Sequence, residues 1–173
     1  MTSLNKNEKG FSLIEIILYI AILVIVLSVL LKSFSAITIS YNKVKSINRI
    51  ESSVIIGMER MEREIRNATS IDLLQSVFNT SPGSIFLNAT DSYGNATTTK
   101  FYISNQSLKM MIGGADQGSL VSNQVQVTSL IFVLIDNTNS KEVKIEMTLQ
   151  SGTGSSLVVK NFYDSVVLRG SYK

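Results

Sequence analysis

Apolar residues dominate the start of the chain. From Phe11 to Leu31 almost every residue is apolar, and the only charged side chain in this run is Glu15. A helix of about 20 apolar residues is long enough to cross the hydrocarbon core of a bilayer. The run is therefore predicted to be a membrane-spanning helix, and its one carboxylate needs an explanation.

The residues after this run keep a helical pattern. Between residues 37 and 68 there is no proline, and Gly57 is the only glycine. The charged residues are spaced for i,i+4 ion pairs such as Glu62–Arg66. One helix from about residue 11 to residue 68 is expected, with an apolar stripe in its last third that a sheet must cover. The stripe repeats every three or four positions: Tyr41, Val44, Ile47, Ile50, Val54, Met58, Met61, Ile65 and Ala68.

Short apolar segments separated by turn residues follow and predict β-strands. The clearest is residues 125–135, whose apolar end at 130–135 suggests burial on both faces. Residues 143–149 alternate apolar and polar side chains, as a strand with one buried face does. Asn105-Gln106 suggests a hairpin turn, and residues 113–124 are expected to form a loop. Further strands are expected at residues 85–87, 100–103, 108–112 and 157–168.

These elements predict an α+β fold, in which a long N-terminal helix packs under an antiparallel sheet. The chain would divide into a leader at residues 1–10, a membrane-spanning helix at 11–31, an extramembrane amphipathic helix at 32–68 and a β-sheet head at 69–173.

The 173 residues include no cysteine and no histidine. This composition excludes disulfides, thiolate zinc sites, histidine-ligated metals and the Ser-His-Asp and Cys-His types of catalysis. The net charge is +3, and Lys6, Glu8 and Lys9 account for +1 of it, which leaves +2 for the rest. Such a balance does not favour nucleic-acid binding. We expect no enzyme activity, no cofactor and no small-molecule substrate.

One loop holds oxygen ligands of the kind that calcium prefers, at Asp136, Asn139 and Glu142. Their spacing does not match an EF-hand loop, and Asp and Asn are common residues of hairpin turns. A plain turn is therefore the favoured interpretation and a calcium site its alternative. No metal site is predicted elsewhere.

Glu15 is costly where it lies. A carboxylate at the centre of a bilayer costs about 2.5–3.5 kcal/mol on insertion scales, and less toward the interface. A compensating positive charge would arise if the chain were cut between Gly10 and Phe11, because the cut creates a new amine four residues before Glu15.

The residues around this bond closely resemble the leader of type IV prepilins, the class III leader. The resemblance rests on the basic residues Lys6 and Lys9, the pair Gly10-Phe11, Glu15 four residues later, and the apolar run. It implies that a membrane prepilin peptidase cleaves after Gly10 and N-methylates the new terminal Phe11.

The same resemblance implies a role for Glu15 and a location for the chain. Glu15 would pair with the N-terminal amine of a neighbouring subunit. The chain would cross the cytoplasmic membrane once between Phe11 and Leu31, with its N-terminus in the cytoplasm and its head outside. It would then enter a filament in the periplasm or at the cell surface. Its partners would be the peptidase and other pilins or pseudopilins, packed helix against helix.

Two further segments resemble the larger minor pseudopilins: the Glu/Arg-rich helix end at residues 58–66 and the closing segment from Val166 to Arg169. Major pilins often carry a proline where this chain has Lys32. The resemblance therefore implies a minor pilin or pseudopilin. Such a structural subunit initiates or caps a type IV pilus or a type II secretion pseudopilus.

Several other interpretations stay open. An ordinary secretory signal could end in the small residues near Ala36, although its apolar region is typically shorter than this one. A generic single-pass anchored domain would treat Glu15 as accidental. Within the filament class, the alternatives are a DNA-uptake pseudopilin and an adhesive tip subunit, whose head would carry a basic or apolar patch for its ligand.

Overall fold

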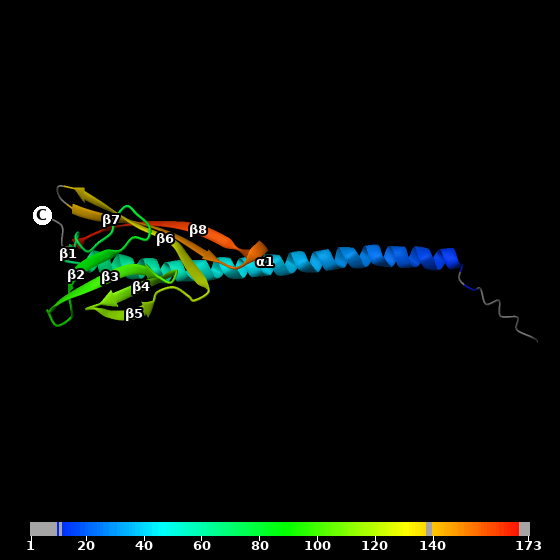
Figure 1. The fold of residues 1–173 in the computed structure, drawn as a ribbon, viewed down its shortest axis with the longest axis horizontal. Coiled ribbons are helices and arrows are strands. Elements are labelled where there is room, and N and C mark those ends of the chain that lie inside the picture. Colours follow the sequence, from blue (N-terminus) through cyan, green and yellow to red (C-terminus); the bar gives the residue numbers. More distant parts are fainter. Residues whose placement is uncertain (1–9, 11, 138–139, 170–173) are drawn as a thin grey trace, which may run out of the picture. The chain divides into compact units, whose positions relative to one another are not determined.

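The computed structural model describes residue 10, residues 12–137 and residues 140–169. These residues form one long α-helix, one 3-10 turn and eight strands (Figure 1). In chain order the elements are α1 (Leu13–Asn67), β1 (Ser70–Ile71), β2 (Ile85–Thr90), β3 (Ala96–Ser104), β4 (Ser107–Ile112), β5 (Ala115–Ser119), β6 (Val125–Asn137), β7 (Ser140–Ser151), η1 (Gly154–Ser156) and β8 (Val158–Val167). A long N-terminal helix with antiparallel sheets confirms the α+β prediction.

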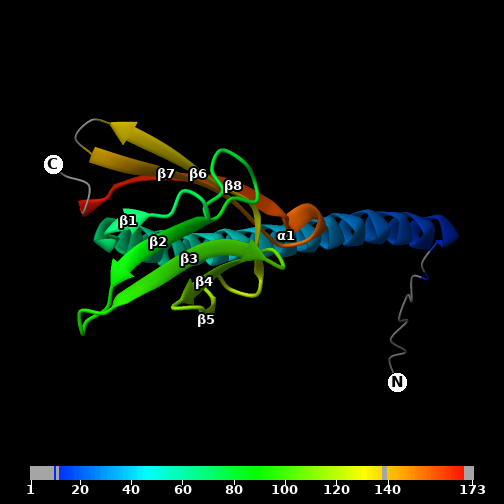
Figure 2. The ribbon, with the colours of Figure 1, turned by 60° about the vertical axis from the view of Figure 1, so that its left-hand side comes forward.

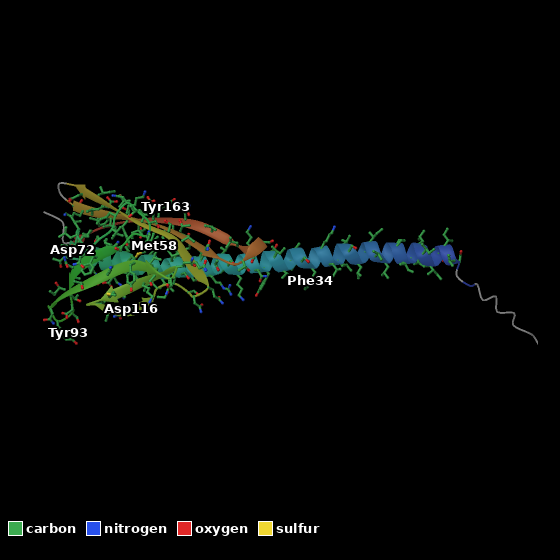
Figure 3. The ribbon with its side chains drawn as sticks, in the orientation of Figure 1. Phe34, Met58, Asp72, Tyr93, Asp116 and Tyr163 are labelled. Atoms are coloured by element: carbon green, nitrogen blue, oxygen red, sulfur yellow. The ribbon has the colours of Figure 1, made fainter. Side chains whose placement is uncertain are left out.

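The chain is organised as two units, Met1–Tyr41 and Asn42–Lys173, and α1 contributes to both. In the first unit the helix is apolar and exposed on every side. Leu13 is 76% exposed and Phe34 is 70% exposed, and Figure 3 shows Phe34 projecting outward from the helix. This part of α1 is long and apolar enough to cross a membrane. The helix also continues through Lys32 without a break.

In the second unit α1 buries one stripe. Ile50, Met61 and Ile65 are fully buried. The buried stripe starts later than predicted, since Tyr41, its first predicted member, is 67% exposed. Gly57 lies on the buried face, and a Cβ there would come within 3.1 Å of the Leu108 side chain on β4. A glycine in this helix therefore allows β4 to approach closely.

The first sheet is a five-stranded antiparallel meander in the order β1-β2-β3-β4-β5. Its inner face is apolar in register: Ile85 on β2 lies opposite Phe101 on β3, which lies opposite Met110 on β4. The hairpin between β3 and β4 turns at Asn105 and Gln106, both with positive φ, as predicted.

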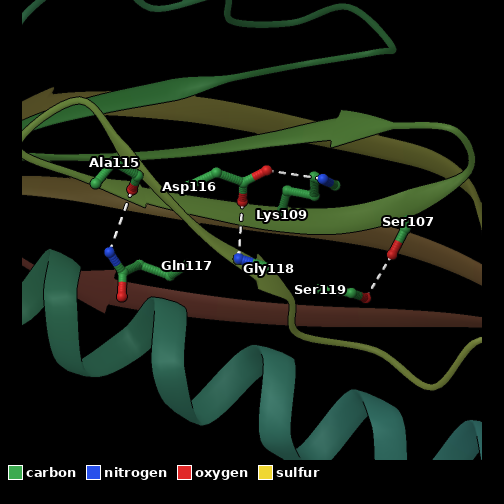
Figure 4. Close-up of polar contacts among 7 residues, drawn as sticks. All are labelled: Ser107, Lys109, Ala115, Asp116, Gln117, Gly118 and Ser119. Atoms are coloured by element: carbon green, nitrogen blue, oxygen red, sulfur yellow. Dashed lines mark hydrogen bonds and ion pairs between the residues drawn. The ribbon is translucent and has the colours of Figure 1, made fainter.

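The expected loop at residues 113–124 is wrong in part, because it contains the edge strand β5. No apolar alternation marks this strand, and polar contacts tie it to β4 (Figure 4). The ammonium of Lys109 donates to the carboxylate of Asp116 at 2.8 Å, and the hydroxyls of Ser107 and Ser119 share a hydrogen bond. The hydrogen bond from Lys109 lowers the pKa of Asp116 below its usual range, and the same bond raises the pKa of Lys109.

The second sheet is a three-stranded antiparallel meander in the order β6-β7-β8. On β7 the side chains of Val143, Ile145, Met147 and Leu149 are buried and their neighbours are not, which confirms the predicted alternation. The prediction that 130–135 is buried on both faces is wrong. Leu130 and Phe132 are fully buried, but Ile135 is 37% exposed. The outer face of this sheet is only partly covered.

One hydrophobic core joins all three layers of the second unit, which is called the head from here on and includes the part of α1 from Asn42. It contains α1 residues such as Met61, first-sheet residues such as Phe101, and second-sheet residues such as Phe132. Figure 2 shows the two sheets on different sides of the C-terminal part of α1. The head therefore has two sheets instead of the single one expected, and each covers part of the helix.

Candidate functional site

The predicted cleavage site lies where the described chain begins. Gly10 is exposed, and nothing lies within 4 Å of the position that a Cβ would take. Phe11, Lys6 and Lys9 lie outside the described residues. The Gly10 side of the predicted scissile bond is therefore open in this structure.

α1 begins at Leu13, two residues after Phe11. The carbonyl of Ser12 accepts hydrogen bonds from the amides of Glu15 and Ile16, at 3.0 and 3.2 Å, so Ser12 occupies the position just before the first helical turn. Glu15 is in that first turn. Free amides and the positive end of the helix dipole lie there, and both favour a carboxylate. The start of the helix is thus the least unfavourable place for Glu15 within the apolar segment.

Glu15 has a partner that the sequence analysis missed. The phenol of Tyr19 donates a hydrogen bond to Oε1 of Glu15 at 2.9 Å. The two residues are four apart, so their side chains lie on the same face of the helix. A hydroxyl four positions after a carboxylate is a weak sequence signal, because the spacing alone does not show whether the two side chains point toward each other.

The arrangement leaves part of the carboxylate available. Glu15 is half-buried against its own helix, and the contact with Tyr19 uses one oxygen. Within the described residues, no contact occupies Oε2. An apolar helix surface that carries a single carboxylate with one open oxygen can accept a further donor, such as an amine, from a neighbouring chain.

The structure does not bring the two described members of the calcium candidate together. Asp136 lies opposite Lys141 across the β6–β7 ladder and forms an ion pair with it at 3.2 Å. Glu142 lies opposite Ile135, one position along, so its side chain points to the other face of the sheet. There it accepts a hydrogen bond from the Ser165 hydroxyl. The third member, Asn139, lies outside the described residues.

The remaining described residues offer no alternative metal centre. They contain no group of three or more His, Cys, Asp or Glu side chains that could hold a metal ion. Glu15 and its surroundings are therefore the strongest candidate site.

Two comparisons with known proteins give positive findings. Residues 5–31 match the family model for the prokaryotic N-terminal methylation motif. The fold is similar to that of a type IV-like pilin from Thermus thermophilus, with a TM-score of 0.59 and 6% sequence identity, over 72% of this chain and 100% of that one. No curated protein matches the chain.

The matched residues include positions 5–10 of the predicted leader, the Gly10–Phe11 bond, Glu15 and the apolar segment up to Leu31. The roles of the single residues stay predictions. The structural similarity, at so low an identity, concerns the fold alone. The chain is therefore type IV pilin-like, with a class III leader and a pilin-like fold. Neither finding points to an enzyme family.

Proposed function

We propose that the chain is a minor pilin or pseudopilin, a structural subunit that initiates or caps a type IV pilus or a type II secretion pseudopilus. The observation that carries this proposal is the helix segment after the leader. Its apolar side chains are exposed, and it bears a single carboxylate in its first turn. Such a surface is stable in lipid or against other apolar helices, and unstable in water.

The minor role is supported by the course of α1. The helix continues through Lys32 as one element, at the position where major pilins often carry a proline that bends it. We infer that the peptidase and neighbouring pilins are the partners. We also infer that the head lies outside the cytoplasmic membrane and the leader inside it.

Assembly would bring an amine first to the open oxygen Oε2 of Glu15, and the charge pair would then replace Tyr19 as the partner of the carboxylate. Before cleavage the nitrogen of Phe11 is part of the peptide bond to Gly10. Cleavage after Gly10 converts it into a free amine. The amine of one subunit then reaches the carboxylate of its neighbour in a setting of low dielectric constant, where a charge pair is much stronger than in water. Tyr19 would hold the carboxylate in the single subunit until that exchange.

The experiment that tests processing is mass analysis of the N-terminal peptide from native membranes. The mature chain should begin at Phe11 and carry one methyl group on its amine. The variant Gly10→Val should remain full-length, because its branched side chain fills the open position at the bond. A mature wild-type chain that begins near residue 36 would reject the proposal and restore the secretory signal.

A second experiment tests the filament role. A photo-crosslinker placed at Ile22, an exposed position of the apolar helix, should capture other pilin-like proteins in native membranes and in sheared filaments. The same crosslinker at Tyr93, which is 88% exposed in the turn after β2, is the control for non-specific capture. Equal capture of unrelated membrane proteins from both positions would contradict a specific filament.

A further inference from the structure

The head contains a polar pocket of about 560 Å³ that the assembly role does not use. Its wall on α1 is formed by side chains four and three residues apart, which places them on one face of the helix. The opposite wall comes from the ends of β6 and β7 and from the connections before β6 and before β8. The polar pocket is lined by Asn42, Lys45, Ser46, Arg49, Asn123, Gln124, Gln126, Gln150, Ser151, Gly152, Thr153 and Ser156. All belong to the second unit.

The walls of the polar pocket are fixed by contacts among themselves. The hydroxyl of Ser151 donates to the carbonyl of Gln124 at 2.8 Å and joins the end of β7 to the connection before β6. The side-chain nitrogen Nε2 of Gln150 donates to the side-chain oxygen Oε1 of Gln126 at 2.6 Å. Gly152 has a φ of +93°, and a Cβ there would lie 2.7 Å from the Ser46 hydroxyl oxygen. The β7–β8 connection is therefore held close against α1.

The charge of the polar pocket is one-sided. Lys45 and Arg49 line it, and no acidic side chain does. Within the described residues neither of them takes part in an ion pair. Like charges at i and i+4 of a helix oppose each other. A bound anion would remove this repulsion and would gain charge-assisted hydrogen bonds from both side chains.

The remaining lining groups are suited to hydroxyls. Five of them are side-chain amides, on Asn42, Asn123, Gln124, Gln126 and Gln150, and others are hydroxyls. Amides and hydroxyls both donate and accept hydrogen bonds. No aromatic side chain is among the lining residues, so recognition would depend on hydrogen bonds and charge. The volume falls within the range of about 300–1,000 Å³ that is usual for small-ligand sites.

We propose that the polar pocket binds a small hydroxylated anion of the sugar-acid or sugar-phosphate class. Lys45 and Arg49 hold the carboxylate or phosphate, and the amides and hydroxyls hold the sugar hydroxyls. This is a binding site without chemistry, and it does not depend on the assembly role of Glu15. It supplies the head with a specific ligand surface that the sequence pattern does not reveal.

The test is calorimetric titration of the full chain in a neutral polyoxyethylene detergent, with glucuronate, glucose 6-phosphate and glucose as probes. At least one of the two anions should bind saturably, and glucose should bind at least about tenfold more weakly, since it lacks the charge. The double variant Lys45→Ala/Arg49→Ala should lose about tenfold or more in affinity for that anion.

Two variants keep the result interpretable. Lys43→Ala removes the same charge from an exposed position of the same helix that does not line the polar pocket, and should change the affinity by less than about twofold. Lys45→Glu reverses the charge at an exposed position, where folding should be retained, and should abolish binding of the anion. Circular dichroism of each variant checks the fold.

Three results would overturn the proposal. The first is that neither anion binds saturably. The second is that Lys43→Ala weakens binding as much as the double variant does, which would mean that the general surface charge attracts the anion. The third is that the chain binds only to vesicles with anionic lipid and not to the free sugar anions, which would assign the two cations to the membrane surface.

Discussion

α1 is one continuous helix that meets two different surroundings. In the first unit its apolar side chains are exposed on every side, and Glu15 is the only charged residue of α1 before Lys32. In the second unit it shows a buried stripe, including Ile50 and Met61, and charged side chains on the remaining faces. The same backbone geometry therefore carries two opposite distributions of polarity.

The difference shows what each part of the helix depends on. In the head, stability comes from apolar area removed from water, and charges at the surface contribute little. In the apolar segment almost every side chain is suited to lipid, so further apolar contact is nearly neutral and the rare polar group decides the partner. A substitution in the head should thus affect folding, and a substitution in the apolar segment should affect assembly.

The largest effect is expected in the head. Ile50→Asp places an unpaired charge in the core, where Ile50 is fully buried, and should lower the free energy of unfolding by about 3 kcal/mol or more. Ile55→Asp makes the same change on the same helix where the side chain is 54% exposed, and should change it by less than about 0.5 kcal/mol. Thermal unfolding followed by near-ultraviolet circular dichroism measures both. Equal losses would mean that the stripe does not define the buried face.

The next effect is expected in the apolar segment and concerns assembly. Glu15→Leu leaves a wholly apolar surface, so the head should keep its unfolding temperature and the membrane level should stay unchanged. Recovery of the chain with sheared filaments should fall by about tenfold or more, because the charge pair is lost. Ile16→Leu, a neutral change one residue on, is the control. Assembly of Glu15→Leu at the parental level would contradict the pairing, or would place the subunit at the extreme tip, where no neighbour lies ahead of it.

A smaller effect of opposite sign is expected from Tyr19→Phe. This change removes only the hydroxyl that donates to Glu15. A hydrogen bond in an apolar segment contributes about 0.6 kcal/mol on average, so the single subunit should become less stable by a similar amount. The carboxylate should then favour a neighbour's amine, and recovery in filaments should rise by about two- to threefold. A fall like that of Glu15→Leu would instead show that Tyr19 supports the assembled state.

The sequence predicts the helix and most strands well, because periodicity reports directly on burial. The expected helix from residue 11 to 68 agrees within two residues with Leu13–Asn67. β5 escapes prediction because Ala115–Ser119 contains no apolar alternation, and its pairing depends on polar contacts at a sheet edge. The prediction overestimates the burial of residues 130–135, because an apolar run in the sequence does not show what covers the second face of the strand. The division into two sheets has no signal in the chain.

The candidate site divides in the same way. Gly10, Phe11 and Glu15 could be proposed from the sequence, since their spacing relative to an apolar run is distinctive, and their roles stay predictions. Tyr19 could not be singled out, because its role depends on the direction of one side chain. The polar pocket draws residues from positions 42 to 156, and only the folded chain brings them together.

The smallest effect is expected from the contact between Lys109 and Asp116, which lies in water, whereas the contact between Glu15 and Tyr19 lies in the apolar segment. Lys109 and Asp116 form a hydrogen bond of 2.8 Å, close to the 2.9 Å between Tyr19 and Glu15, but both side chains reach solvent. The pKa of Asp116 is lowered in the folded chain, so the contact stabilises the β4–β5 hairpin above the ordinary pKa of an aspartate. The stabilisation is lost as the pH falls through the lowered value.

Asp116→Asn should therefore remove a small acid-dependent increase in amide exchange within β5 and leave the unfolding temperature of the head unchanged. Asp91→Asn, in the turn after β2, should leave exchange in β5 unaffected. A large drop in unfolding temperature for Asp116→Asn would show that an exposed polar contact can count as much in the head as a polar contact does in the apolar segment, and the contrast between the two surroundings would fail.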